Sequence, residues 1–310
     1  MLSLDAMNIS LPERRLDIAH DFEELGIDRR TSIVYSRMYG FRKCPVISSN
    51  QTERLYLMSS AVDLVKREQV DIQDIRYIIH AHTGQQIGVH GDSLPTALQR
   101  KLGAKNCISF GTQSNKCVSL ISSLNMLRKL LKLHPKGSKA LLLLGEVADT
   151  KEMRLIDAGI CGDSATAILI SLDGDSDQLL GLATHTQGRY FRGIWDTTES
   201  EEAYNKYLVD YFRTVIDAAL ADAGVTLEDV SYIAPHNVNI NVWKKIATNL
   251  PFPLEKIYLS NIPLIGHCFG SDLIINYHDI KTNNLVKKGD LCLLVTAGVG
   301  GVFGAAVIKY

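Results

Sequence analysis

A short pattern occurs twice in this chain and constrains its fold more than any other feature. The stretch VDIQDIRYIIHAH, which begins at Val70, aligns with VTLEDVSYIAPHN, which begins at Val225, at an offset of 155 residues. Each copy is typical of a turn that leads into a buried strand. A second pair, KGSKALLLLGE and KKGDLCLLVTAG, matches Gly137 with Gly289 at an offset of 152. Because two separate stretches agree on nearly one offset, the sequence predicts an internal duplication.

The duplication divides the chain into two similar predicted halves, residues 1–170 and 171–310. Apolar runs such as 139–147 predict buried strands, and helical spacing over 116–133 and 202–224 predicts amphipathic helices. Strands that are apolar on both faces need helices on both faces. We therefore expect an α/β sandwich with covered sheets and a site between the halves.

Composition excludes several classes of function. The 310 residues are 46% hydrophobic and carry a net charge of -1, which argues against nucleic acid as the main ligand because phosphate binding needs a basic balance. The first residues contain neither a signal peptide nor a membrane-spanning stretch, so we expect a cytoplasmic protein with no membrane contact. The six cysteines lack CxxC spacing, so we expect most of them to be buried free thiols.

One cysteine lies where chemistry is favoured. In SFGTQSNKCVSLISSLNML, residues 109–127, a polar turn passes into an apolar helical run, and Cys117 lies at the boundary. If the helix begins near Lys116, unpaired N–H groups and the helix dipole stabilise a thiolate at Cys117. The same N–H groups stabilise an oxyanion on a thioester attached to that sulfur. The alternative is a buried structural cysteine, and position alone leaves it open.

Two histidines occur in contexts that suit an active site. His236 follows a predicted buried strand that Pro235 ends, and His267 lies in the glycine-bracketed loop GHCFGSD, where an offset of 151 from Cys117 falls on Cys268. A lone histidine of this kind is more often a structural residue than a functional one, but two of them at positions related by the duplication, together with Cys117, favour a functional site.

Two other ligand sites are not favoured. His80, His82 and His90 have no cysteine or carboxylate at ligand spacing, so no metal is expected. No helix follows GVGGVFG, so a dinucleotide loop is not expected there.

The stretches APHNVNINVWKKIA, LEKIYLSNIPLIGHCFGSD, ICGDSATAILI and KKGDLCLLVTAGVGGVFGAAVIKY resemble β-ketoacyl-acyl carrier protein synthase III and its relatives in the thiolase superfamily. The resemblance covers nearly the whole chain. It implies a thiolase-like fold, two similar halves that form a layered α-β-α-β-α sandwich. It also implies that Cys117 takes an acyl group from acyl-CoA or an acyl carrier protein, and that His236 assists the second substrate. The N–H groups of Cys117 and of Gly300 or Gly301 would form the oxyanion hole.

The sequence departs from the family pattern at three positions. His267 replaces the usual Asn, so that the expected catalytic set is Cys117, His236 and His267; Gly301 replaces a Phe, which would open the site, and Asn241 replaces an Arg. With these changes we expect the two histidines to act on the second substrate. Residues proposed to bind substrate or carrier are Asn239, Arg37, Arg42, Lys244 and Lys245.

The expected activity is acyl transfer from Cys117. The first possibility is decarboxylative Claisen condensation with a malonyl thioester in fatty acid, polyketide or specialised metabolism. The second is transfer to an alcohol or amine with His236 as general base. The third is a catalytically silent module that binds acyl-CoA or an acyl carrier protein. Coenzyme A or phosphopantetheine would serve as a substrate rather than a cofactor, no other cofactor is expected, and the resemblance implies a homodimer.

Overall fold

Nine strands form one hydrogen-bonded sheet in this computed structural model, which describes residues 1–48, 52–84, 93–156 and 159–310. Their order is β11–β12–β13–β10–β1–β9–β6–β4–β5. The strands span β1 Ser3–Ser10, β4 Ile75–Ala81, β5 Ile108–Thr112, β6 Lys139–Leu144, β9 Ala165–Ser171, β10 Gln178–Thr186, β11 Val230–Pro235, β12 Leu291–Gly298 and β13 Val302–Lys309.

The sheet has two wings that repeat one pairing pattern. In the first wing β1 and β6 pair with β9 in antiparallel fashion, and β6 pairs with β4 in parallel; β10, β13, β12 and β11 repeat this pattern in the second wing. The wings meet between β1 and β10, whose strand register gives only the pair Ser3 and Gln178. The strands β4 and β11, which contain the repeated sequence, occupy matching places next to β6 and β12. The division between residues 170 and 171 stays a prediction.

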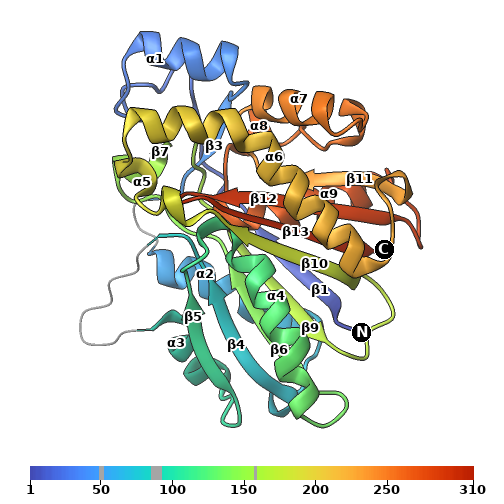
Figure 1. The fold of residues 1–310 in the computed structure, drawn as a ribbon. Coiled ribbons are helices and arrows are strands. Elements are labelled where there is room, and N and C mark those ends of the chain that lie inside the picture. Colours follow the sequence, from blue (N-terminus) through green and yellow to red (C-terminus); the bar gives the residue numbers. More distant parts are fainter. Residues whose placement is uncertain (49–51, 85–92, 157–158) are drawn as a thin grey trace.

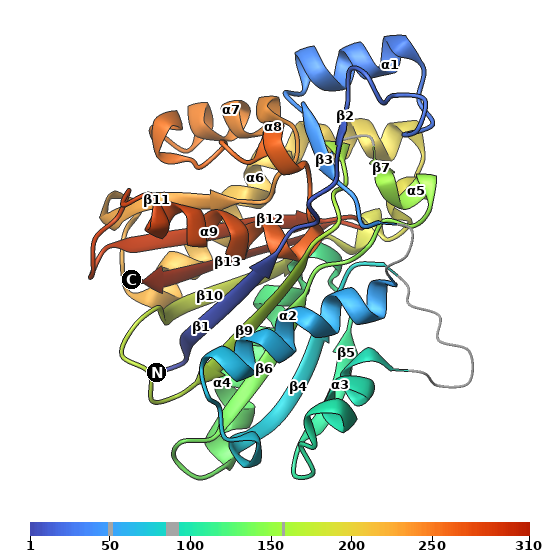
Figure 2. The same ribbon diagram turned by 180° about the vertical axis from the view of Figure 1, so that it is seen from behind.

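Helices cover both wings and produce the predicted layers (Figures 1 and 2). In the views from the two sides, α2 and α4 lie on opposite faces of the first wing, and α6 and α9 lie on opposite faces of the second. These helices and the two that accompany them span α2 Glu53–Arg67, α3 Leu94–Leu102, α4 Ser119–Leu130, α6 Thr198–Ala223, α7 Ile240–Asn249 and α9 Asp272–Thr282.

Three core clusters follow from this layering. Successive strand residues point to opposite faces, so Leu141 packs with α2 and α3 while Leu142 packs with α4 and α9. In the second wing Leu293 packs with α6 and α7, and Leu294 joins the cluster that contains α4 and α9. The central cluster therefore takes side chains from both wings, and the α-β-α-β-α prediction is confirmed.

Local sequence explains where the principal helices begin and end. Thr52 and Thr197 cap α2 and α6 by accepting hydrogen bonds from backbone N–H groups three residues later. Gly224 ends α6 in the left-handed conformation, with φ of 69°, as its position after the apolar pattern predicts. The remaining elements are short: β2 Arg15–Asp17, α1 Arg29–Ile33, β3 Lys43–Pro45, α5 Lys151–Arg154, β7 Leu155–Ile156, β8 Gly159–Ile160 and α8 Ile262–Ile265.

The described helices include none with the length and apolar character needed to cross a membrane. All six cysteines are buried and free, which confirms that part of the prediction.

Candidate active site

Cys117 lies in a strained turn that opens α4. Lys116, Cys117 and Val118 form one turn of 3-10 helix, and α4 begins only at Ser119, slightly later than the sequence predicts. Lys116 has φ of 50°, a left-handed conformation that costs roughly 1–2 kcal/mol outside glycine. The cysteine side chain is buried, with 4% of its surface exposed. The turn thus holds the sulfur at the N-terminal end of the helix, where negative charge is stabilised.

The second wing contains the same turn in front of α9. Phe269, Gly270 and Ser271 form a 3-10 turn, Phe269 has φ of 53°, and α9 begins at Asp272. The offset between the two turns is therefore 153 residues, so the counterpart of Cys117 is Gly270 and not Cys268, on which the offset of 151 falls. The second turn contributes no nucleophile; its loop and helix start supply His267 and Asp272 instead.

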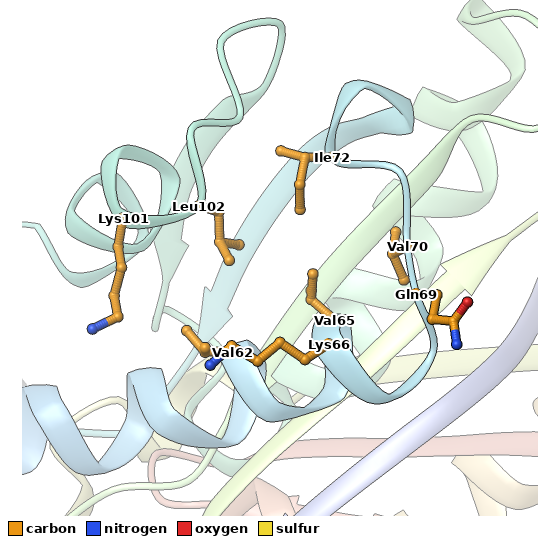
Figure 3. Close-up of a pocket in the computed structure, with 8 residues that line it drawn as sticks. All are labelled: Val62, Val65, Lys66, Gln69, Val70, Ile72, Lys101 and Leu102. Atoms are coloured by element: carbon orange, nitrogen blue, oxygen red, sulfur yellow. The ribbon is translucent and has the colours of Figure 1, made fainter.

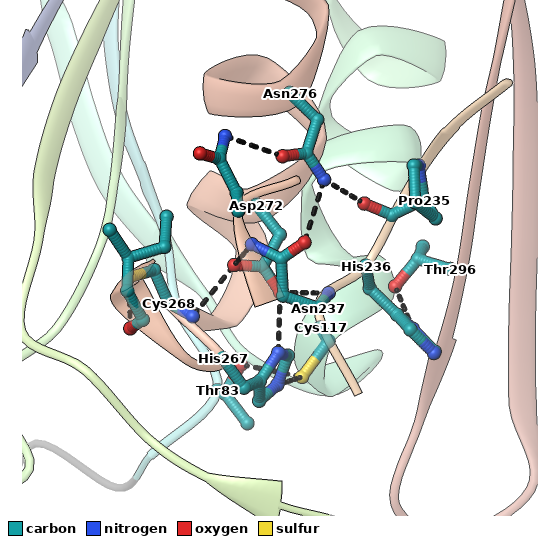
Figure 4. Close-up of polar contacts among 12 residues, drawn as sticks. Thr83, Cys117, Pro235, His236, Asn237, His267, Cys268, Asp272, Asn276 and Thr296 are labelled. Atoms are coloured by element: carbon teal, nitrogen blue, oxygen red, sulfur yellow. Dashed lines mark hydrogen bonds and ion pairs between the residues drawn. The ribbon is translucent and has the colours of Figure 1, made fainter. Parts of the chain in front are cut away.

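Cys117, His267 and Asp272 form a continuous hydrogen-bonded series (Figure 4). His267 Nε2 lies 3.4 Å from Cys117 Sγ, and His267 Nδ1 lies 2.5 Å from Asp272 Oδ2. Burial lowers the pKa of His267, but Asp272 and Cys117 more than offset it, so the pKa lies well above its usual value. Because Nδ1 donates to the carboxylate, a neutral His267 presents the lone pair of Nε2 to the sulfur.

Asp272 is itself held in place by several donors. Its carboxylate accepts hydrogen bonds from the backbone N–H of Cys268, at 2.7 Å, and of Asn237, at 2.6 Å, and from the Asn237 side chain, at 3.2 Å. The side chain is completely buried. These donors fix the orientation of the carboxylate toward His267.

His236 has a different environment in the same site. Its Nδ1 accepts a hydrogen bond from the backbone N–H of Ala297, at 2.8 Å, and lies 3.1 Å from Thr296 Oγ1. Burial, with a smaller contribution from His267, lowers its pKa to about 3. A neutral imidazole whose Nδ1 accepts must carry its proton on Nε2. His236 is therefore a hydrogen-bond donor to this site rather than a base.

Cys117, His236 and His267 line one cavity of about 430 Å³. Its other lining residues come mainly from α6, α7, the 190–201 segment and the terminal glycine loop: Tyr39, Ile156, Tyr190, Gly193, Asp196, Ser200, Glu201, Tyr204, Asn205, Leu208, Phe212, Val238, Asn239, Val242, Ala297, Gly298, Val299, Gly300 and Gly301. The mixture of aromatic, apolar and polar surface around a buried nucleophile is typical of a small-molecule site.

The terminal glycine loop approaches Cys117 at Gly298. A Cβ placed there would lie 3.3 Å from the Cys117 backbone N, so only a glycine avoids crowding the turn. Gly300 and Gly301 line the same cavity, but a Cβ on Gly301 would meet Gln187 O and the Tyr190 ring instead. The assignment of an oxyanion donor to Gly300 or Gly301 stays a prediction.

The residues predicted to bind substrate or carrier differ in their exposure. Asn239 lines the cavity and caps α7, where its Oδ1 accepts from Val242 N at 3.2 Å. The four predicted basic contacts, Arg37, Arg42, Lys244 and Lys245, are exposed and are absent from the described cavity lining.

The histidines considered as metal ligands form a stacked pair at the end of β4. The rings of His80 and His82 are 4.6 Å apart, and His90 lies outside the described residues. Within the described part of the chain, no group of three or more His, Cys, Asp or Glu side chains is arranged to hold a metal ion.

A second hollow of about 560 Å³ lies at the surface beside α2 and α3 (Figure 3). Its lining is aliphatic and polar and contains no cysteine, serine, histidine or carboxylate: Val62, Val65, Lys66, Gln69, Val70, Ile72, Lys101 and Leu102. The cavity at Cys117 is therefore the candidate site.

Comparison with known proteins finds relatives of similar sequence. The model of the 3-oxoacyl-[acyl-carrier-protein] synthase III C-terminal family matches residues 220–310. β-Ketoacyl-[acyl-carrier-protein] synthase III of a Wolbachia strain is 24% identical over 82% of each chain. The corresponding Xanthomonas campestris protein is 22% identical over 97% of this chain and 95% of its own.

Solved structures share the fold over the whole length. ChlB3, which is described as an acyltransferase, superposes with a TM-score of 0.88 at 18% identity and covers 99% of this chain and 97% of its own. The Aquifex aeolicus synthase III gives 0.78 at 19% identity, with complete coverage of both chains. The chain is therefore similar in sequence to β-ketoacyl-[acyl-carrier-protein] synthase III and has the fold of these solved structures. The similarity in sequence indicates an acyltransferase of the condensing-enzyme type.

Two contacts of the site are not predicted from the sequence. Asp272 orients His267, and the Thr83 hydroxyl donates to Cys117 Sγ at 3.4 Å. Asp272 lies only five residues after His267, but the left-handed turn at Phe269 that brings the two together has no signal in the sequence. Thr83 lies 34 residues before Cys117 and has no local signal.

Proposed function

We propose that this chain transfers an acyl group from a thioester to Cys117 and then to a protic acceptor, a hydroxyl or an amine. The observation that carries the proposal is the contact of His267 with both the sulfur and Asp272. A histidine whose Nδ1 is tied to a carboxylate keeps Nε2 available to accept a proton, as in a nucleophile–His–Asp triad. The proposal differs from the sequence prediction in giving the base role to His267.

In the first half-reaction the Cys117 thiol passes its proton to His267 Nε2, and the thiolate attacks the thioester carbonyl. The tetrahedral oxyanion forms near the N-terminus of α4, where N–H groups and the dipole stabilise it. The bond from the carbonyl carbon to the donor sulfur then breaks, and the donor leaves as a thiol with the proton from His267. His267 is thus engaged in acylation as well as in the second step.

In the second half-reaction the acceptor loses its proton to His267 Nε2 while its oxygen or nitrogen attacks the acyl carbon. The Cys117–acyl bond breaks, and the thiolate recovers a proton from His267. His236 stabilises the developing negative charge with the Nε2 proton that its contact with Ala297 requires. No cofactor is needed for either step.

Decarboxylative condensation is the second candidate, and the donor character of His236 favours it. A malonyl thioester that loses carbon dioxide leaves an enolate oxygen, which the Nε2–H of His236 would stabilise. A second donor would come from His267 only in its doubly protonated form, because Asp272 occupies Nδ1. The synthase names of the curated relatives support this candidate. The triad geometry favours the protic acceptor.

Acyl-CoA or an acyl carrier protein is the proposed donor. The exposed Arg37, Arg42, Lys244 and Lys245 are the proposed contacts for an acidic carrier or its phosphate.

We also propose a homodimer that pairs β5, the edge strand of the first wing, with its copy in a second chain. Ile108 on this strand has 58% of its surface exposed, which suits burial in such a contact.

Intact mass spectrometry tests the proposal in two stages. The protein is mixed with a panel of acyl-CoAs and acyl carrier proteins, with Cys117→Ala as the control, and an added acyl mass confined to Cys117 is expected. The isolated acyl enzyme is then offered primary alcohols, primary amines or malonyl thioesters. Discharge to an ester or amide supports the proposal, and discharge with release of carbon dioxide assigns condensation instead. No adduct from any donor would favour the catalytically silent binding module.

A further inference from the structure

Glu146 is a buried acid that the proposed reaction leaves unused. It follows β6, and only 2% of its surface is exposed. Its Oε1 accepts a hydrogen bond from the backbone N–H of Thr83, and its Oε2 accepts one from Gly84 N at 2.6 Å. A carboxyl in the core that meets two converging N–H donors fixes the backbone to which those donors belong.

The backbone that Glu146 holds leads directly to the nucleophile. Thr83 follows the end of β4, and its hydroxyl donates to Cys117 Sγ at 3.4 Å (Figure 4). His267 reaches the same sulfur from the loop before α9, also at 3.4 Å. Two groups from different wings of the sheet therefore contact one sulfur atom. A thiolate accepts more than one hydrogen bond, and each donor to it favours the charged form.

We infer that the Thr83 hydroxyl is a second hydrogen-bond donor to the Cys117 thiolate and that Glu146 is the positioning residue that orients it. Thr83 touches the reacting atom, whereas Glu146 acts only through Thr83 and Gly84. The inference rests on the proposed function in one respect, that Cys117 is the nucleophile. It adds to the triad a donor that stays in place while His267 exchanges protons.

The protonation of Glu146 follows from its surroundings. Burial raises its pKa to about 7, while the N–H groups of Gly84 and Thr83 and the Thr83 hydroxyl, which also lies within reach of the carboxylate, act in the opposite direction. Glu53, at the start of α2, adds to the rise. His80 on β4 contacts the backbone carbonyl of Gly145, the residue before Glu146. Burial lowers the pKa of His80 to about 3, so this imidazole is neutral. The carboxylate accepts from both N–H groups above about pH 7, and protonation below that pH removes one acceptor site.

The test measures the rate of Cys117 alkylation by iodoacetamide from pH 5.5 to 8.5, followed by intact mass. Four variants are compared with the wild type: Thr83→Val, Thr83→Ser, Glu146→Gln and Cys117→Ala as the background. At pH 8, Thr83→Val is expected to slow alkylation about tenfold, as for loss of one hydrogen bond to a charged group. Thr83→Ser retains the hydroxyl and should stay within about twofold of the wild type.

The Glu146 variant separates positioning from a purely structural role. Glu146→Gln resembles the protonated acid, so the ratio of wild-type to variant rates should rise from near 1 below pH 6 to about 10 above pH 8. Equal rates for Thr83→Val and the wild type would overturn the inference for Thr83. A ratio independent of pH, or faster alkylation of Glu146→Gln, would overturn it for Glu146. Because alkylation needs no acyl donor, these outcomes stand apart from failure of the acyl-transfer proposal.

Discussion

His236 and His267 line one cavity yet have pKa values shifted in opposite directions. His236 accepts from the Ala297 N–H and lies beside the Thr296 hydroxyl, both uncharged groups, so burial lowers its pKa to about 3. His267 is equally buried but contacts Asp272 and Cys117, and its pKa is raised well above the usual value. The partners of a buried histidine, rather than its depth, therefore decide whether it donates a hydrogen bond or exchanges a proton.

The largest expected effect comes from removing the histidine with the raised pKa. His267→Ala should slow both acylation of Cys117 and discharge of the acyl enzyme by about 10³-fold, because general acid–base catalysis is lost in each step. Rapid-quench intact mass spectrometry with a donor that acylates the wild type measures both rates. His278→Ala, a half-exposed histidine on α9, is the control. Unchanged acylation with slow discharge would confine His267 to the second substrate.

Removing His236 should slow acyl transfer less and should leave the pH dependence of the rate unchanged. His236→Ala loses one oxyanion donor, which predicts an approximately 10²-fold slower overall transfer. Since the pKa of His236 is about 3, it stays neutral across the working range and cannot shape the pH–rate profile. His236→Asn, which keeps an N–H donor, should recover part of the rate. A pH profile that changes in His236→Ala would mean that this histidine exchanges a proton.

The pH dependence of the free energy of unfolding should also show that His236 is neutral in the folded protein. Its folded-state pKa of about 3 lies below the unfolded value of 6.5, so the unfolded chain binds a proton that the folded chain does not. The resulting loss of stability begins as pH falls below 6.5 and approaches about 1.4 kcal/mol per pH unit for this group. Urea unfolding at pH 7.0, 6.0 and 5.0 should show a shallower fall for His236→Asn. If the free energy of unfolding falls equally with pH in the wild type and in His236→Asn, His236 does not contribute to the pH dependence of stability.

The smallest effect is expected in the terminal glycine loop, which brings Gly298 to Cys117 and lines the cavity shared by the two histidines. Gly301 has φ of 76°, and a Cβ there would lie 2.7 Å from Gln187 O. Gly301→Ala should lower the free energy of unfolding by about 1–3 kcal/mol. Gly188→Ala is the matched control, because a Cβ on Gly188 meets nothing within 4 Å. Equal melting temperatures for the two variants would contradict the crowded geometry.

The sequence predicts the layers and the main groups of the candidate site for physical reasons. The buried strands β4, β6, β11 and β12 are recognisable because their apolar runs are covered on both faces. Cys117 is recognisable because a polar turn meets an apolar helix there. β5 was missed because its five residues are half-buried or exposed at the sheet edge.

The rest of the site depends on contacts that the chain makes only after folding. Asp272 reaches His267 because the left-handed Phe269 turns the chain back between them, and no residue type in FGSD signals that turn. Glu146 and Thr83 are 63 residues apart and meet only because β4 and β6 are neighbours. The offset of 151 residues from Cys117 falls two residues short of Gly270, its structural counterpart, for a similar reason. The turns before α4 and α9, and not the strands, decide where each helix starts.

The pH dependence of Cys117 alkylation in Asp272→Asn tests the central claim, that Asp272 and His267 together hold the sulfur ready to react. The rate at which the wild type reacts with iodoacetamide should rise by no more than about tenfold between pH 6 and 8, the rise expected from ionisation of Glu146. The variant should react on the order of 10²-fold more slowly at pH 6 and recover as pH approaches the pKa of an ordinary thiol, about 8.5. Asp279→Asn, the same substitution farther along α9, should behave as the wild type. A wild-type profile for Asp272→Asn would contradict the claim, because the histidine would then activate the cysteine without its carboxylate.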